Sequence, residues 1–202
     1  MFIQVIQGKV SDEAGLRRCL ARWHSDLEPG ADGYLGTTSG VCADGAFIAL
    51  ARFDSEQAAR RNSERPEQGA WWAETEKCFE GDVRFVDCPD VRQWLNGGSD
   101  AAGFVQIMQG HSRDRDRMHA VMTQNADRIQ QLRPEIIGGT FSTFGDDGYV
   151  EAVYFRSEDE ARAHETMDLP DDLRSVLEEQ QELMGDVTFF DLRDPMLVSV
   201  GR

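Results

Sequence analysis

The pattern of apolar and polar residues at the start of the chain returns in its second half. Positions 2–8 read FIQVIQG and positions 104–110 read FVQIMQG, an offset of 102 residues. Two further matches follow in the same order, 53–60 with 155–162 and 81–85 with 185–189. Three ordered matches indicate an internal duplication, so we expect two repeats that fold alike.

Each repeat continues from its first strand into an amphipathic helix. In both copies apolar residues recur every three or four positions, as expected for one buried helix face. These positions are Leu16, Cys19, Leu20, Trp23 and Leu27 in the first copy, and Met118, Val121, Met122, Asn125 and Ile129 in the second. Asn125 stands where the first copy has Trp23, so the two faces are not equivalent. Ser11 and Ser112 are the candidate N-caps of these helices.

A strand pair comes next in each copy. Apolar runs at 34–42 and 47–53 flank Asp44-Gly45, and runs at 137–144 and 149–155 flank Asp147-Gly148. Asp-Gly between two apolar runs is typical of a tight β-turn, because both residues tolerate a positive φ. The sequence therefore predicts one hairpin in each repeat.

A second helical region and a last strand complete each repeat. Ser157 and Glu160 have the spacing of a capping box, and Pro66 and Pro170 are expected to divide the helical region of each copy into two parts. A strand follows the Gly-Asp pair of each copy. The predicted order is β-α-β-β-α-β twice, which is the ferredoxin-like α+β motif with antiparallel sheets.

These elements set the expected division of the chain. The first repeat spans residues 1–88, a linker spans 89–103, the second repeat spans 104–194 and a C-terminal tail spans 195–202. The linker contains Gly-Gly-Ser, which favours flexibility. Trp94 and Leu95 are expected to pin the linker against one of the repeats.

The second copy also carries a short pattern at the end of its hairpin, formed by Phe155, Ser157, Ala161, Ala163 and His164. Together with the duplicated unit, this pattern resembles the antibiotic biosynthesis monooxygenase group of dimeric α+β barrel proteins. The resemblance covers both repeats. It implies that helices cover one face of each sheet, and that the two open faces pack together as an intrachain α+β barrel with a ligand pocket on each side.

Composition and charge limit the partners. The chain has 37 acidic and 21 basic residues, a formal charge of −16, and such a surface repels nucleic acid and anionic lipid. Neither a membrane-spanning run nor a signal region is visible, so we expect a cytoplasmic protein. The four cysteines are too widely spaced for a zinc site or a disulfide framework. We therefore expect a small-molecule ligand, and association of the fused chain into a homodimer stays open.

The resemblance implies two catalytic candidates in the second repeat. Gln109 lies near the end of a first strand, where relatives carry an amide that holds substrate or oxygen. His164 lies on the second helix, where relatives often place a histidine or tryptophan facing the pocket. We expect His164 to deprotonate an electron-rich aromatic substrate and Gln109 to hold its oxygen atom.

The candidate substrate-binding residues come from both repeats. Gln7 and Asn62 are the first-repeat counterparts of Gln109 and His164. Gln4 and Gln7 point to opposite faces of a strand, so only one of them can line a pocket. The family analogy favours Gln7. Adjacent helical residues point about 100° apart, so one of Trp71 and Trp72 is expected to pack inward and the other to face a pocket. Glu151 is a candidate base if it is buried.

No nucleotide-binding, serine-hydrolase or zinc-peptidase motif occurs in the sequence, and neither a metal site nor a cofactor is expected. The leading hypothesis is a small-molecule-binding protein that acts as a cofactor-independent monooxygenase on an aromatic or quinol-like substrate. A non-catalytic ligand-binding or stress-related module and a haem-binding protein are the alternatives that the sequence leaves open.

Overall fold

The computed structural model describes residues 1–165 and 170–200, without the side chains of Glu165 and Asp172. The chain forms two compact units, one built from residues 1–89 and 196–202 and the other from 90–195. Each unit is an α+β structure with an antiparallel five-stranded sheet in the described residues. The predicted fold class is confirmed in both repeats, whereas the expected packing of the open sheet faces against each other stays a prediction.

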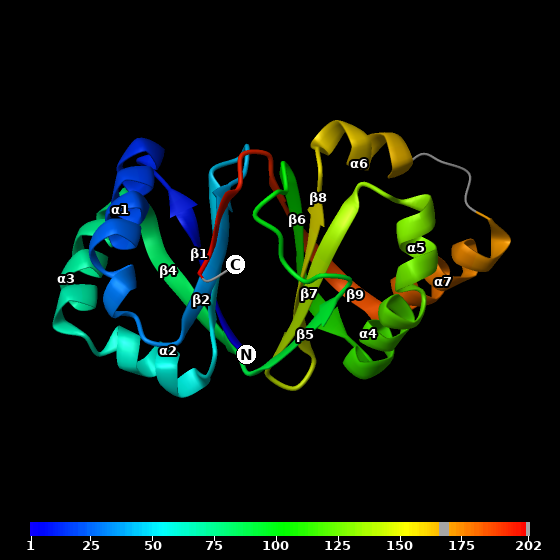
Figure 1. Cartoon of the computed structure of the whole chain (residues 1–202), viewed down its shortest axis with the longest axis horizontal. Helices are drawn as coiled ribbons and strands as arrows, with labels where there is room; N and C mark the ends of the chain where they lie inside the picture. Colours follow the sequence, from blue (N-terminus) through cyan, green and yellow to red (C-terminus); the bar gives the residue numbers. More distant parts are fainter. Residues whose placement is uncertain (166–169, 201–202) are drawn as a thin grey trace. The chain divides into compact units, whose positions relative to one another are not determined.

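The first unit consists of one sheet with helices on one of its faces (Figure 1). In sheet order, the strands are β10 (Met196–Ser199), β2 (Tyr34–Val41), β3 (Ala46–Phe53), β1 (Phe2–Val10) and β4 (Phe79–Cys88). The helices are α1 (Glu13–Asp26), α2 (Glu56–Ser63) and α3 (Pro66–Thr75), with short 3-10 turns at Glu28–Gly30 and Glu76–Cys78.

The second unit repeats this order. Its strands are β5 (Asp90–Trp94), β7 (Ile136–Phe144), β8 (Gly148–Phe155), β6 (Phe104–Ser112) and β9 (Met184–Leu192). Its helices are α4 (Arg115–Gln124), α5 (Ala126–Leu132), α6 (Glu158–Glu165) and α7 (Asp171–Leu183), again on one face of the sheet (Figure 1). None of the described helices is both long and apolar enough to span a membrane.

The outer strands β5 and β10 differ from the expected division of the chain. Strand β5 lies in the segment expected to be a linker, and it pairs with β7 of the second unit. Strand β10 lies in the expected C-terminal tail, and it pairs with β2 of the first unit. The segment that follows each repeat therefore supplies an edge strand to the sheet of the other repeat. Arg52 holds β10 in place, because its Nη2 donates to the carbonyl oxygen of Val198 at 2.9 Å.

Helix ends follow local hydrogen bonding. The N-caps of α1 and α4 are Asp12 and Asp114 instead of the predicted Ser11 and Ser112, and each carboxylate accepts a backbone N–H three residues on. Pro66 begins α3 and Pro170 precedes α7, as predicted. The first helix of the second repeat is divided at Asn125, whose Nδ2 donates to the carbonyl oxygen of Val121 at 2.7 Å. An amide at this position satisfies a helical carbonyl, whereas Trp23 in the first repeat packs into the core.

Candidate active site in the first unit

A cavity of about 300 Å³ lies in the first unit, between the helix-covered face of the sheet and helices α1, α2 and α3. Strand alternation decides which residues reach it. Phe47, Ala49, Ala51 and Phe53 of β3 line the cavity, whereas Arg52 points to the opposite face. Alanines in the middle of the strand leave a space that larger side chains would fill. A volume of this size is at the lower end of the range for small-molecule sites.

The wall of the cavity is aromatic. It includes Trp23, Tyr34, Phe47, Phe53, Trp71 and Trp72. Trp23 lies edge-on to Tyr34, with ring centroids 4.8 Å apart, and donates its indole N–H to Gln68 Oε1 at 2.6 Å. Trp71 donates its N–H to the carbonyl oxygen of Cys19 at 2.8 Å. These bonds fix the indole planes, so the walls are suited to a flat, apolar guest.

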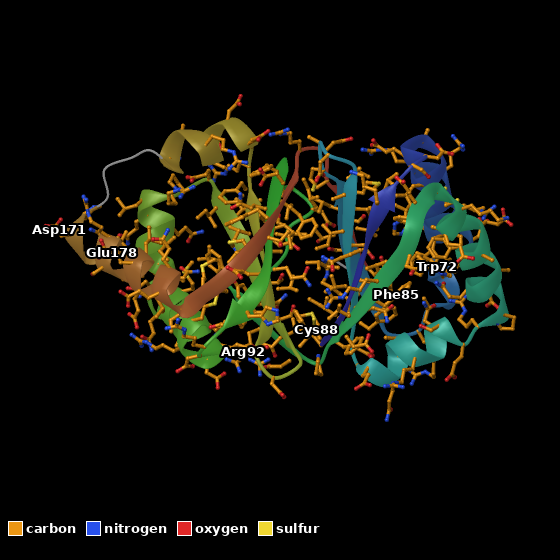
Figure 2. All side chains as sticks on the ribbon, turned by 180° about the vertical axis from the view of Figure 1, so that it is seen from behind. Trp72, Phe85, Cys88, Arg92, Asp171 and Glu178 are labelled. Carbon is orange, nitrogen blue, oxygen red and sulfur yellow. The ribbon has the colours of Figure 1, made fainter. Side chains whose placement is uncertain are left out.

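Trp72 closes one side of the cavity. It comes from α3 and points toward Phe85 of the edge strand β4 (Figure 2), with ring centroids 5.1 Å apart in an edge-on arrangement. Phe85 is 46% exposed, so the outer side of this pair reaches the surface. Trp71 and Trp72 both line the cavity, and Trp71 also belongs to the hydrophobic core of the unit.

Three amide side chains among the described residues line the cavity. Gln4 on β1 uses its Nε2 to donate to Asp87 Oδ1 at 3.0 Å, and the other two amides come from the helical region. Asn62 at the end of α2 is buried, and its Oδ1 accepts a hydrogen bond from Arg65 Nη1 at 2.9 Å. Gln68 Oε1 is occupied by Trp23. In Asn62 and Gln68 the oxygen is engaged, which leaves the NH₂ group to offer hydrogen bonds to a guest. Such donors suit a carbonyl or phenolate oxygen.

One histidine also lines the cavity. His24, in the last turn of α1, has its Nδ1 2.7 Å from the carboxylate of Glu28 Oε2. A carboxylate on Nδ1 fixes the imidazole orientation and leaves Nε2 as the nitrogen that can accept a proton. His24 was not among the site residues predicted from the sequence. The signal was the His-Glu spacing of four residues, which brings two side chains together on one helical turn.

Similar folds are known. A candidate monooxygenase of Fusobacterium nucleatum is similar with a TM-score of 0.77 at 9% identity, over 99% of this chain and 94% of that one. An anthrone oxidase-like protein gives 0.72 at 7% identity, over 100% and 94%. A ferredoxin-fold protein of Listeria monocytogenes related to antibiotic biosynthesis monooxygenases gives 0.51 at 12% identity, over 97% and 96%. No family model and no curated protein sequence matches the chain.

The chain has the fold of these monooxygenase-related proteins. At identities of 7–12% the likeness concerns the fold. The roles of individual residues therefore have to be inferred from the geometry of this chain.

The two catalytic candidates of the sequence analysis lie apart. Phe104 and Met108 of β6 pack with the helices, so Gln109 belongs to the opposite face of the sheet. His164 lies on α6, on the helix-covered face. The same alternation in β1 places Gln4, and not the favoured Gln7, among the cavity residues. A strand pattern separates two faces, but it does not tell which face the helices cover.

His164 is held by its neighbours. Its Nδ1 lies 3.1 Å from Glu135 Oε2 and 3.0 Å from the carbonyl oxygen of Glu160. Glu135 is 1% exposed and also pairs with Arg133. This arrangement ties α6 to the segment before β7, which is a structural use of the histidine.

Glu151 lies on the helix-covered face of β8 and is 1% exposed. Burial raises the pKa of its carboxyl to about 7, and the nearby Trp94 side chain opposes part of the rise. Glu151 occupies the position that Ala49 has in the first repeat, where the cavity lies. The structure thus brings Asn62, Trp71 and Trp72 together in the first unit, and places Glu151 and His164 in the second.

Proposed function

We propose that the first unit binds a planar aromatic phenol in its cavity and that the chain acts on this molecule as a cofactor-independent monooxygenase. The observation that carries the proposal is the His24–Glu28 pair on the wall of an aromatic cavity that also contains the amides of Asn62 and Gln68. Trp71 and Trp72 provide flat apolar surface for the ring system. Asn62 and Gln68 provide N–H donors for its oxygen atoms.

The proposed reaction requires a general base that removes the phenolic proton, and the substrate itself supplies the electrons. His24 Nε2 takes the phenolic proton, and the phenolate that forms carries enough electron density on its para carbon to react with dioxygen. One oxygen atom becomes bonded to that carbon. The other leaves as water together with the phenolic hydrogen and the hydrogen of the para C–H. The products are a para-quinone and one water, so the substrate supplies all four electrons.

Two further points support this class of reaction. Structures with the same fold include candidate monooxygenases and an anthrone oxidase-like protein. The amide donors would stabilise a phenolate more than a phenol, because hydrogen bonds to a charged oxygen are the stronger ones. The side chains of Asn62 and Gln68 would then both bind the substrate and stabilise its phenolate form.

Binding and turnover of 1-naphthol test the proposal. Three of the four tryptophans line the cavity, so bound naphthol is expected to quench much of the tryptophan fluorescence. One dioxygen should be consumed for each 1,4-naphthoquinone formed, and ¹⁸O₂ should label a single oxygen of the product. Binding without oxygen uptake would instead support the non-catalytic ligand-binding module. Absence of binding would contradict the proposal, and a Soret band upon haem titration would favour the haem-binding alternative.

A further inference from the structure

Trp94 occupies the strand position that Val198 has in the first unit. In β5 it lies opposite Gly139 of β7, and in β10 Val198 lies opposite Thr37 of β2. Gly139 and Thr37 are separated by the repeat offset of 102 residues. Val198 lines the cavity of the first unit. The register therefore directs Trp94 toward the equivalent space of the second unit.

The indole lies within that space. A Cβ atom added to Gly139 would be 2.1 Å from Trp94 Nε1, so the ring lies directly over this glycine. Trp94 is 2% exposed and belongs to the same core cluster as Met122, Ile136 and Val153. The first-repeat counterparts of these three residues are Leu20, Tyr34 and Ala51, all of which line the cavity. The indole is thus surrounded by the counterparts of residues that line the first cavity.

Polar atoms in this core are left unsatisfied. Among the described residues, Trp94 Nε1 and Glu151 Oε2 are buried without a hydrogen bond of good geometry, as are Glu135 Oε2 and, in the neighbouring cluster around Phe141, Tyr149 Oη. Glu151 and Tyr149 lie on the same face of β8, two residues apart. The Trp94 side chain lies close enough to Glu151 to oppose the rise of its pKa, and yet neither buried atom makes a well-formed hydrogen bond, which is rare in a core built only for packing. Each unsatisfied buried group of this kind calls for a physical explanation.

We propose that the second unit contains a second aromatic-binding site whose occupant is the chain's own Trp94 side chain. The site takes a planar bicyclic molecule that carries an N–H or O–H donor, and Glu151 is the acceptor for that donor. Gly139 makes room for the ring where the first unit has Thr37. The proposal concerns residues of the second unit only, so it does not depend on the function proposed for the first.

Removal of the indole tests this assignment. In Trp94→Ala, calorimetry should show one more indole bound per chain than in the wild-type protein. Indene has the shape of indole without the N–H, so it should bind to the additional site about tenfold more weakly. In Trp94→Ala with Glu151→Leu, the preference for indole over indene should disappear while the additional site remains.

The outcomes separate this proposal from the one for the first unit. The number of indoles bound by the wild-type protein reports on the first cavity, and the increase in Trp94→Ala reports on the second site. An unchanged number in a folded Trp94→Ala variant overturns the second site. If the variant unfolds, it should regain cooperative unfolding with millimolar indole and not with indene. Failure of indole to restore folding also overturns the proposal.

Discussion

Replacing His24 with alanine is expected to lower the rate of oxygen uptake with 1-naphthol by about 100-fold or more, the usual contribution of a general base. The imidazole lines the cavity, and Glu28 holds its Nδ1 at 2.7 Å, so Nε2 is the nitrogen left to accept a proton. Absorbance provides a second measurement that does not depend on turnover. Bound naphthol should show the longer-wavelength phenolate band in the wild-type protein and not in the variant.

His164→Ala is the matched control for this prediction. It removes a histidine from the second helical region of the other repeat, where the imidazole contacts Glu135 and the carbonyl oxygen of Glu160. Oxygen uptake should stay within about twofold of wild type, because a side chain away from the reacting atoms contributes no proton transfer. A loss of activity in His164→Ala together with normal activity in His24→Ala would show that the base lies in the second unit.

Replacing Glu151 with glutamine is expected to make the protein more stable at pH 8 by about 3 kcal/mol. The folded-state pKa is raised from 4.5 to about 7 by burial. Below pH 4.5 the carboxyl is protonated in the folded and unfolded states alike, so it carries no penalty. Between pH 4.5 and 7 only the unfolded state releases the proton, and the free energy of unfolding falls by about 1.4 kcal/mol per pH unit.

Urea unfolding at pH 5, 6, 7 and 8 measures this effect. The difference between Glu151→Gln and wild type should grow with pH up to about 7 and then level off. Glu178→Gln is the control, because Glu178 is exposed on α7 (Figure 2) and the substitution has the same chemistry. A difference that is constant with pH, or equal in the control, would contradict a buried acid with a raised pKa.

The sequence predicted most of the fold because its signals are local. The two Asp-Gly turns, Ser157 and the helix-breaking prolines depend on a few neighbouring residues each, and the duplication repeats them. Strands β5 and β10 escaped prediction for the opposite reason. They are five and four residues long, and they form by pairing with β7 and β2, which lie far away in the sequence. Short edge strands of this kind carry little periodicity of their own.

The candidate site was predicted only in part. Asn62 could be selected as the repeat counterpart of His164, and Trp71 and Trp72 because adjacent residues on a helix point in different directions. Gln4 was passed over because strand alternation gives two faces and the family analogy favoured the other one. The different use of the helix-covered sheet face, with a cavity in the first unit and the buried Trp94 side chain in the second, was not predicted. It depends on two pairs of counterparts, Ala49 with Glu151 and Val198 with Trp94. Val198 and Trp94 become equivalent only because β10 and β5 pair with the sheet of the other repeat.

The location of the binding site is tested most directly by filling the first cavity. Val198→Trp with Thr37→Gly would copy the arrangement of Trp94 over Gly139 into the first unit. Val200→Trp adds the same side chain at an exposed position just beyond β10, and Thr37→Gly alone controls for the lost side chain. We predict that fluorescence titration detects 1-naphthol binding to the wild-type protein and both controls, and at least tenfold weaker binding to the double variant. Equal affinity in all four proteins would contradict it.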